Sequence, residues 1–274
     1  MPPANSTDAL PAGSAFVGRL LDFAQPVADD VCLDVTYDNA SVAAAMRSRV
    51  RHVATVDAGP ARDLSPTMPR VPADTVPFGV AAMSARGPAG PDAAPHAIRG
   101  AVRHRPAGVA PDTLPVRAVV SALPYKDGVF TLVTTQYPVH RLNDPIAAVR
   151  EMLRVCRPDG RLIIAGLVRS STATAERDRL ERLRDPEHRG TPSLSRLTGL
   201  LVDAGANVRR LDVFVVERPA EPWLAGCDDA SAGAIRAALI AEIDGGPRTG
   251  AHPRIIGGEL WFTQSWAQIA AVRA

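Results

Sequence analysis

Two histidines and one aspartate are the side chains best suited by position to acid–base chemistry or ligand binding. His140 follows a β-branched segment at 129–135, where a histidine could take a proton from a hydroxyl group or an acidic carbon. A solvated loop position is the alternative interpretation of His140. His188 could reach the mouth of a binding site or cap a helix. Asp57 ends another apolar segment, where an acid could bind a ligand or lie in a turn.

Other kinds of chemistry lack a matching pattern. No group of histidine, cysteine and acidic residues has the spacing of metal ligands, so we expect no metal site. No Gly-x-Ser-x-Gly motif for a nucleophile occurs either. The 3 cysteines are odd in number and far apart, which argues against a disulfide framework and favours a reduced, cytoplasmic compartment.

The elements that would position these side chains alternate along the chain. The predicted strands are 31–35, 52–57, 116–120, 129–135, 161–168, 208–216 and 260–272. The predicted helices are 41–49, 144–156, 193–204 and 232–243, and a turn is predicted at 158–160. Strands alternating with helices indicate a parallel sheet covered on both faces. In such sheets ligands bind at the carboxyl ends of the strands, near the point where the strand order reverses.

Composition excludes several classes of protein. Hydrophobic residues make up 46% of the 274 residues, enough for a sizeable core, which excludes a wholly disordered or fibrous chain. The net charge of +2 argues against a dedicated binder of nucleic acid or anionic membrane. No apolar run approaches the roughly 20 residues of a membrane helix, and we see no secretion signal at the N-terminus.

Proline is unusually frequent, with 25 residues, and it clusters between 58 and 117. Each proline removes a backbone donor, so this stretch is predicted to be a long irregular insertion rather than a separate domain. We expect one domain over 1–274. Its parts would be a first half at 16–57, the insertion at 58–117 and a remainder at 118–274, with a lid region at 222–243.

One long segment resembles a known family. Residues 122–168, ALPYKDGVFTLVTTQYPVHRLNDPIAAVREMLRVCRPDGRLIIAGLV, are similar nearly position by position to a stretch of the class I S-adenosylmethionine (SAM) methyltransferases, in particular the ubiquinone/menaquinone-biosynthesis type. The sequence RLRDPEH at 182–188 and the DAG at 203–205 also resemble later parts of such proteins, and LDV at 33–35 resembles the end of their first strand.

The resemblance implies a SAM site after the first strand, close to Asp34. The family has G-x-G-x-G there, whereas Thr36, Asp38 and Ala40 stand at the three glycine positions in this chain. The Asp38 carboxylate would lie near that of SAM, and two such charges about 5 Å apart repel by roughly 3 kcal/mol at an effective dielectric near 20. Tyr37 could stack on an adenine or substrate ring, or fill the site.

The resemblance also assigns the other cofactor positions. Asp57 matches the acid that binds the ribose hydroxyls, and Asp63 competes for that role. Val119 stands where the family has the acid that holds the adenine amino group. Thr131 replaces the aspartate of the family's FDLV, which we interpret as one more altered cofactor position.

The fold class implied is a Rossmann-like α/β sandwich with a mainly parallel seven-stranded sheet and an antiparallel C-terminal edge. The function implied is SAM-dependent methyl transfer to a small organic molecule, with His140 as catalytic residue and Tyr37, Tyr137 and His188 on the substrate side. A homodimer or a methyltransferase partner is compatible with this. Because the glycine loop is altered, two alternatives stay open. One is a SAM-independent enzyme for cyclisation, rearrangement or decarboxylation, and the other is a non-catalytic partner of a methyltransferase.

Overall fold

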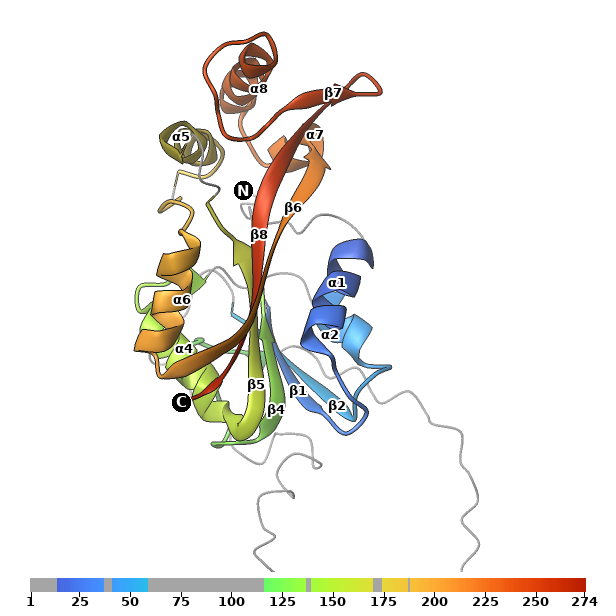
Figure 1. Cartoon of the computed structure of the whole chain (residues 1–274), viewed down its shortest axis with the longest axis vertical. Coiled ribbons are helices and arrows are strands. Elements are labelled where there is room, and N and C mark those ends of the chain that lie inside the picture. The colour runs from blue at the N-terminus through green and yellow to red at the C-terminus, as the bar shows by residue number, and fades with distance from the viewer. Residues whose placement is uncertain (1–13, 37–40, 59–115, 137–138, 170–173, 187) are drawn as a thin grey trace, which may run out of the picture.

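One mixed sheet organises the part of the chain that the structure describes. This computed structural model describes residues 14–36, 41–58, 116–136, 139–169, 174–186 and 188–274. Within these residues the sheet has 8 strands in the order β3-β2-β1-β4-β5-β8-β6, and β7 pairs with β8 (Figure 1). Neighbours from β3 to β5 are parallel, whereas β8 is antiparallel to both β5 and β6. The predicted mainly parallel sheet with an antiparallel C-terminal edge is therefore confirmed, but it has 8 strands among the described residues in place of the seven predicted.

The elements follow the predicted alternation. The strands are β1 (Val31–Thr36), β2 (His52–Asp57), β3 (Val116–Arg117), β4 (Phe130–Thr135), β5 (Cys156–Leu167), β6 (Ala206–Pro219), β7 (Arg254–Ile256) and β8 (Glu259–Arg273). The helices are α1 (Ser14–Ala24), α2 (Ser41–Met46), η3 (Val139–Arg141), α4 (Pro145–Val155), α5 (Thr174–Arg184), α6 (Leu194–Asp203), α7 (Ala220–Leu224) and α8 (Asp229–Ile243).

Local sequence signals explain where two of these helices begin and end. The Asp144 side chain accepts a hydrogen bond from the Ala147 amide at 2.9 Å, and Pro145 occupies the first turn of α4. Ser193 caps α6 in the same way, by accepting from the Arg196 amide at 3.1 Å. The chain leaves α6 through Gly205, whose φ of +89° favours glycine.

Three predicted boundaries were wrong. The predicted turn at 158–160 lies inside β5, which begins at Cys156, and the pairing with β4 shifts register there. The helix predicted at 41–49 ends at Met46, and the strand predicted at 116–120 covers only Val116–Arg117. In addition, α1, η3, α5, α7 and β7 were not predicted.

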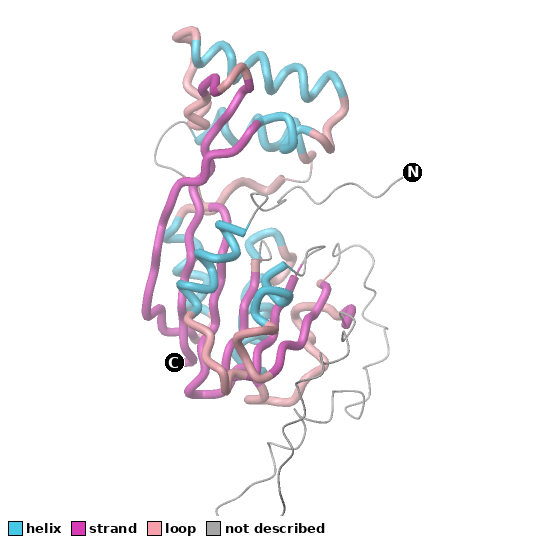
Figure 2. Tube along the Cα trace, turned by 90° about the vertical axis from the view of Figure 1, so that its right-hand side faces the viewer, coloured by secondary structure: helices cyan, strands magenta, loops and turns pink. Residues whose placement is uncertain are grey.

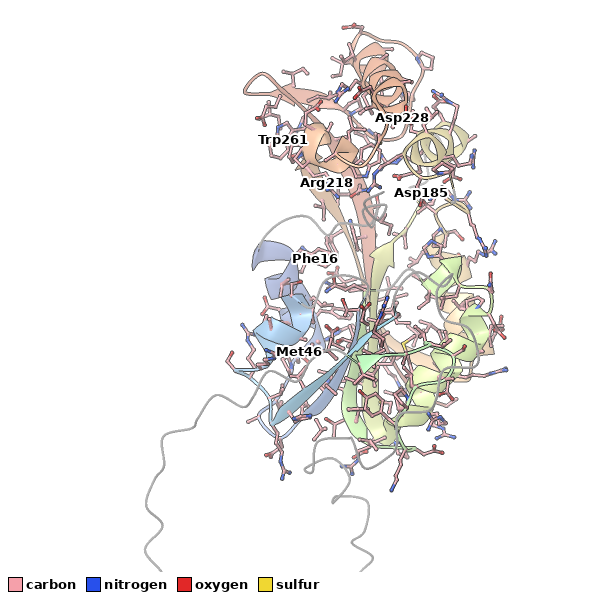
Figure 3. The ribbon with its side chains drawn as sticks, turned by 180° about the vertical axis from the view of Figure 1, so that it is seen from behind. Phe16, Met46, Asp185, Arg218, Asp228 and Trp261 are labelled. Carbon is pink, nitrogen blue, oxygen red and sulfur yellow. The ribbon has the colours of Figure 1, made fainter. Side chains whose placement is uncertain are left out.

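Helices cover both faces of the sheet (Figure 1). Residues of α1 and α2, such as Leu20 and Met46, pack with Cys32 and Leu132 on one face. Residues of α4 and α6 pack with alternate strand residues, such as Leu33, on the other. Figure 3 shows Phe16 and Met46 on the first of these faces. The alternation of β1 between the two clusters means that Asp34 and Thr36, like Cys32, face α1 and α2.

A cap lies beyond the carboxyl ends of the parallel strands (Figures 1 and 2). We use this name for α5, α7, α8 and β7 together with the adjoining ends of β6 and β8. Its own apolar cluster includes Leu180, Trp223, Ile235 and Phe262. The lid region predicted at 222–243 lies in this cap. The division of the chain into parts stays a prediction, since 59–115 lies outside the described residues.

Candidate functional site

The order of the strands locates the candidate site. The chain passes from β1 to β2 on one side and later returns to place β4 on the other side of β1. The strand order therefore reverses between β1 and β4, which is where doubly wound sheets bind their ligands. Figure 1 shows that the carboxyl ends of these strands point towards the cap. A ligand at this edge would lie between the sheet and the cap.

Polar side chains occupy one level of the sheet at this edge. Thr36 of β1 pairs with Asp57 of β2. Gln136 follows the pair Val35–Thr135 and so lies beside Thr36. On the far side of β4, Ala165 of β5 pairs with Gln268 of β8. The strand register therefore brings Asp57, Thr36, Gln136 and Gln268 into one row, interrupted only by Ala165, on the face that α1 and α2 cover.

Asp34 lies two residues before this row and is buried. One carboxylate oxygen accepts a hydrogen bond from the Thr134 hydroxyl at 2.8 Å, and the other accepts from the Ala43 amide of α2 at 3.2 Å. Burial raises the pKa of Asp34 to about 6, although these two hydrogen bonds lower it. Both oxygens are engaged within the protein. Asp34 thus joins the end of β1 to the first turn of α2, the two elements that flank residues 37–40 in the chain.

The predicted ribose acid and adenine position lie close together along the edge. Asp57 is half-buried at the end of β2, and its backbone oxygen accepts from the Ala118 amide at 3.3 Å. Val119 follows in a turn in which its own oxygen accepts from the Ala122 amide at 2.9 Å. The side chain of Val119 is apolar and offers no acceptor to an adenine amino group. Asp57 and Val119 therefore border the same edge, but only Asp57 can accept hydrogen bonds through its side chain.

The two predicted histidines occupy different places. His140 is half-buried in η3, directly beyond β4 and before α4. His188 belongs to the base of the cap, where its Nε2 lies 3.3 Å from Oδ1 of Asp178 in α5. The same Asp178 oxygen accepts from the Thr191 amide at 3.1 Å. Asp178 therefore holds the segment around His188 against α5. Tyr37, Asp38, Ala40 and Tyr137 lie outside the described residues, as does Asp63.

The interpretation of Thr131 as a cofactor position was wrong. Thr131 lies at the amino end of β4, opposite to the edge where a cofactor would bind. Its hydroxyl donates to Oδ1 of Asp30 at 2.6 Å and accepts from the Val31 amide at 3.0 Å. Asp30 in turn accepts from the Arg161 guanidinium at 2.7 Å. Thr131 therefore connects β4 to the start of β1, and the lack of an aspartate at this position does not indicate whether SAM binds.

The base of the cap is tied together by charged and aromatic side chains. The Arg177 guanidinium donates to Oε1 of Glu181 at 2.8 Å and lies 5.1 Å from the ring centre of Phe262. Arg184 donates to the backbone oxygen of Trp223 at 3.0 Å. Figure 3 shows Arg218 and Asp185 in the same region. These contacts join α5 to α7 and β8, so the cap packs as one unit above the site.

A small cavity lies where the cap meets the sheet. Its volume of about 30 Å³ suits roughly one water molecule and is far too small for SAM. Polar residues of α5 and β8 line it, among them Asp178, Glu181 and Gln264. Among the described residues there is no group of three or more histidine, cysteine and acidic side chains that could hold a metal ion. Within the same residues, no helix combines the length and apolar character of a membrane span.

Sequence reasoning missed Gln136 and Gln268. Gln268 lies in the apolar run WAQIAAV, and a lone amide inside such a strand was a signal that could have drawn attention to it. Gln136 directly follows the strong strand pattern of β4. Only the pairing of β5 with β8 brings the two to the same level, and this pairing joins segments about a hundred residues apart.

Comparisons with known proteins agree with this geometry. A family described as "Methyltransferase domain" matches residues 89–164. The uncharacterized methyltransferase YcgJ of Bacillus subtilis is 33% identical over 81 residues, which are 29% of this chain and 32% of that protein. A demethylmenaquinone methyltransferase of Mycolicibacterium vanbaalenii is 43% identical over 58 residues, which are 21% of this chain and 25% of that protein. The chain thus matches a third or less of the length of these curated relatives.

The crystal structure of YcgJ superposes with a TM-score of 0.64 at 18% identity, covering 95% of this chain and 99% of that one. This chain therefore has the fold of YcgJ, and its matched segments are similar to methyltransferases. A geranyl diphosphate methyltransferase in complex with SAM shares the fold, with a TM-score of 0.51 at 14% identity over 95% of this chain and 85% of that one. The family match overlaps the predicted segment 122–168, so the resemblance seen in the sequence is confirmed.

The residues at the edge can be tested against the needs of SAM. A class I methyltransferase site needs an acceptor for the ribose hydroxyls and a close approach of the backbone after β1. Asp57 meets the first need. Asp34 meets part of the second, because it anchors both β1 and α2 around the connecting segment. Thr36 adds a side chain where the family has glycine, and Val119 lacks an acceptor. The residues fit the ribose end of SAM, with two neighbouring positions altered.

Proposed function

We propose that this protein transfers a methyl group from SAM to a small organic molecule bound between the sheet edge and the cap. The observation that carries the proposal is the position of Asp57 beside Thr36 at the carboxyl ends of β2 and β1, next to the reversal of strand order. The match of residues 89–164 to a methyltransferase domain supports the same reaction.

Each side chain at the edge would have a separate task. Asp57 would accept hydrogen bonds from the ribose hydroxyls, and Asp34 would hold β1 and α2 in place without touching the ligand. When bound, SAM supplies an electrophilic methyl group. His140, directly beyond β4, would take the proton that a hydroxyl or carbon acid loses as it is methylated. Most of the rate enhancement would come from holding the two reactants in line.

The cap would contribute the substrate side of the site. Its base reaches the segment after β5, where the Pro192 oxygen accepts from the Arg169 amide at 2.9 Å, and Asp178 holds both Thr191 and His188. His188 would therefore face an acceptor from the side opposite to the cofactor. Cap and sheet together would keep water from the reacting atoms.

Titration calorimetry with SAM and S-adenosylhomocysteine tests the cofactor part of this proposal. We expect dissociation constants of about 1–100 µM for the wild-type protein. Asp57→Asn should weaken binding about 10- to 100-fold, because a hydrogen bond to a charged acceptor is lost. The matched variant Asp63→Asn distinguishes the two candidate acids of the sequence, and it should bind as the wild type does.

Absence of binding at millimolar cofactor, by protein with an unchanged circular dichroism spectrum, would remove the methyltransferase proposal. One observation favours a second candidate in that case. Thr36 fills part of the space that the family keeps open with glycine, and Val119 lacks an acceptor. These changes suit a SAM-independent reaction on the same scaffold, or a protein that supports a methyltransferase without catalysing the reaction.

A further inference from the structure

Two glutamines at the sheet edge have buried amide groups without partners. In the part of the chain that the structure describes, neither the Nε2 nor the Oε1 of Gln136 and Gln268 makes a hydrogen bond, and all four atoms are shut off from solvent. Gln268 as a whole is completely buried. Native proteins rarely leave even one buried amide unsatisfied, because its desolvation is not offset. Two such groups in one row indicate a place where a ligand completes the hydrogen bonding.

The sheet places these two amides on either side of Ala165. Gln136 lies beside Ala165 at the end of β4, and Gln268 pairs with Ala165 across β5 and β8. With strands spaced by about 4.8 Å, the two backbones are about 10 Å apart, and the two amides make no hydrogen bond to each other across this gap. The methyl group of Ala165 is the smallest side chain that could stand between them. Ala165 and Trp266 belong to the same face, and the indole nitrogen of Trp266 also has no partner among the described residues.

Gln136 and Gln268 lie at the end of the row that is farther from the proposed cofactor position. Asp57, the proposed ribose acid, lies two strands from Gln136 on the β2 side. Gln268 lies two strands from Gln136 on the opposite side. A cofactor that extends from β2 to β4 would therefore end where the glutamine pair begins. The pair occupies the side of the site that remains for the methyl acceptor.

The charges around the pair favour a neutral group. Each amide offers two donor hydrogens and an acceptor oxygen. On the β1 side the acids Asp34 and Asp57 lie on the same face of the sheet. On the β6 side Asp212, which pairs with Gln268, already binds Arg19 at 2.8 Å. These acids disfavour an anion, whereas a group with one donor and one acceptor matches the amides.

We propose that Gln136 and Gln268 together bind a neutral carboxamide-like group of the methyl acceptor, with adjacent C=O and N–H groups, above Ala165. That the ligand is the methyl acceptor rests on the proposed function, but the binding of an amide by the two glutamines does not require SAM. Amides without partners lower the stability of the free protein. A ligand site is a place where such a loss is expected, because the amides gain their partners when the ligand binds.

Calorimetric titration with benzamide and its charged isostere benzoate tests the site. We expect benzamide to bind the wild-type protein at least about 10-fold more tightly than benzoate, since only benzamide offers both a donor and an acceptor. Gln136→Leu and Gln268→Leu should each weaken benzamide binding about 10-fold. The control Gln25→Leu changes an exposed glutamine at the opposite end of the sheet and should leave binding unchanged.

Equal affinity for the two probes, no benzamide binding up to about 10 mM, or unchanged binding in both leucine variants would overturn the proposal. Urea unfolding gives a second measurement. Gln268→Leu should be at least as stable as the wild type, because no hydrogen bond is lost, and a marked loss of stability would mean that the amide is satisfied in the free protein. If SAM fails to bind while benzamide binds as expected, only the methyl-transfer proposal fails, and the converse result removes only the amide site.

Discussion

The buried carboxyl group of Asp34 makes the stability of this protein depend on pH, and Asp34→Asn should remove that dependence. Burial raises the pKa of Asp34 from 3.8 to about 6. An acid whose pKa is higher in the folded state contributes stability that is fully present below its unfolded pKa. This contribution is lost as the pH rises through the folded pKa.

The size of the effect follows from the shift. A difference of about two pKa units corresponds to roughly 3 kcal/mol between acid and neutral pH. Part of this loss lies below pH 5, where other carboxyl groups also titrate. Between pH 5 and pH 8 the remaining loss is about 1.4 kcal/mol.

Urea unfolding at several pH values between 5 and 8 measures this loss as the difference between the wild type and Asp34→Asn. The difference should change by about 1.4 kcal/mol in favour of the variant as the pH rises. Thr134→Val is a second perturbation, because it removes the hydroxyl that donates to Asp34 at 2.8 Å and lowers its pKa. In that variant the loss should move to higher pH. A difference that does not change with pH would refute the reasoning, since it would mean that Asp34 is ionised in the folded protein throughout.

Three further substitutions test the scaffold. Arg161→Met removes the cation that lies 2.7 Å from the buried carboxylate of Asp30, and should lower the free energy of unfolding in urea by about 3–5 kcal/mol. The control Arg157→Met breaks a more exposed ion pair and should lower it by about 0–1 kcal/mol. Gly160→Ala puts a methyl group 2.7 Å from the Cys156 sulfur and should lower the stability by about 1–3 kcal/mol. The control Gly199→Ala has open space in α6 and should raise the stability by up to about 1 kcal/mol. A Gly160→Ala variant as stable as the wild type would show that β5 can shift there. Arg154→Met removes donors to the Leu123 and Tyr125 oxygens, so amide hydrogen exchange at 123–128 should accelerate while α6 keeps its protection.

The periodicity of the sequence was enough to predict the scaffold. Asp144 before a proline and Ser193 before an apolar repeat are local signals, and both helices begin where these residues predict. The β-branched segment of β4 similarly needs no tertiary information. The helix α1 was not predicted, although Phe16, Leu20 and Ala24 repeat at helical spacing and form part of the core.

The site was predicted less well because its geometry depends on strand pairing. Thr131 was assigned to the cofactor by its place in a motif, but its position at the amino end of β4 makes it part of the Asp30 network. Gln136 and Gln268 become neighbours only through β5, which the order of the chain does not reveal. Asp57 needed no such pairing, since the end of a parallel strand already lies at the ligand edge.

The place of β8 in the sheet has a consequence for biosynthesis. β8 follows the other described strands in the chain, yet it lies between β5 and β6. It pairs with β5 over Leu162–Leu167 and with β6 along nearly all of its length. Until residues 259–273 leave the ribosome, β5 and β6 therefore have no contact with each other, and each has an open edge of apolar residues. A nascent chain in this state is prone to aggregate, so the yield of folded protein should depend on chaperones and on the rate at which these residues are translated.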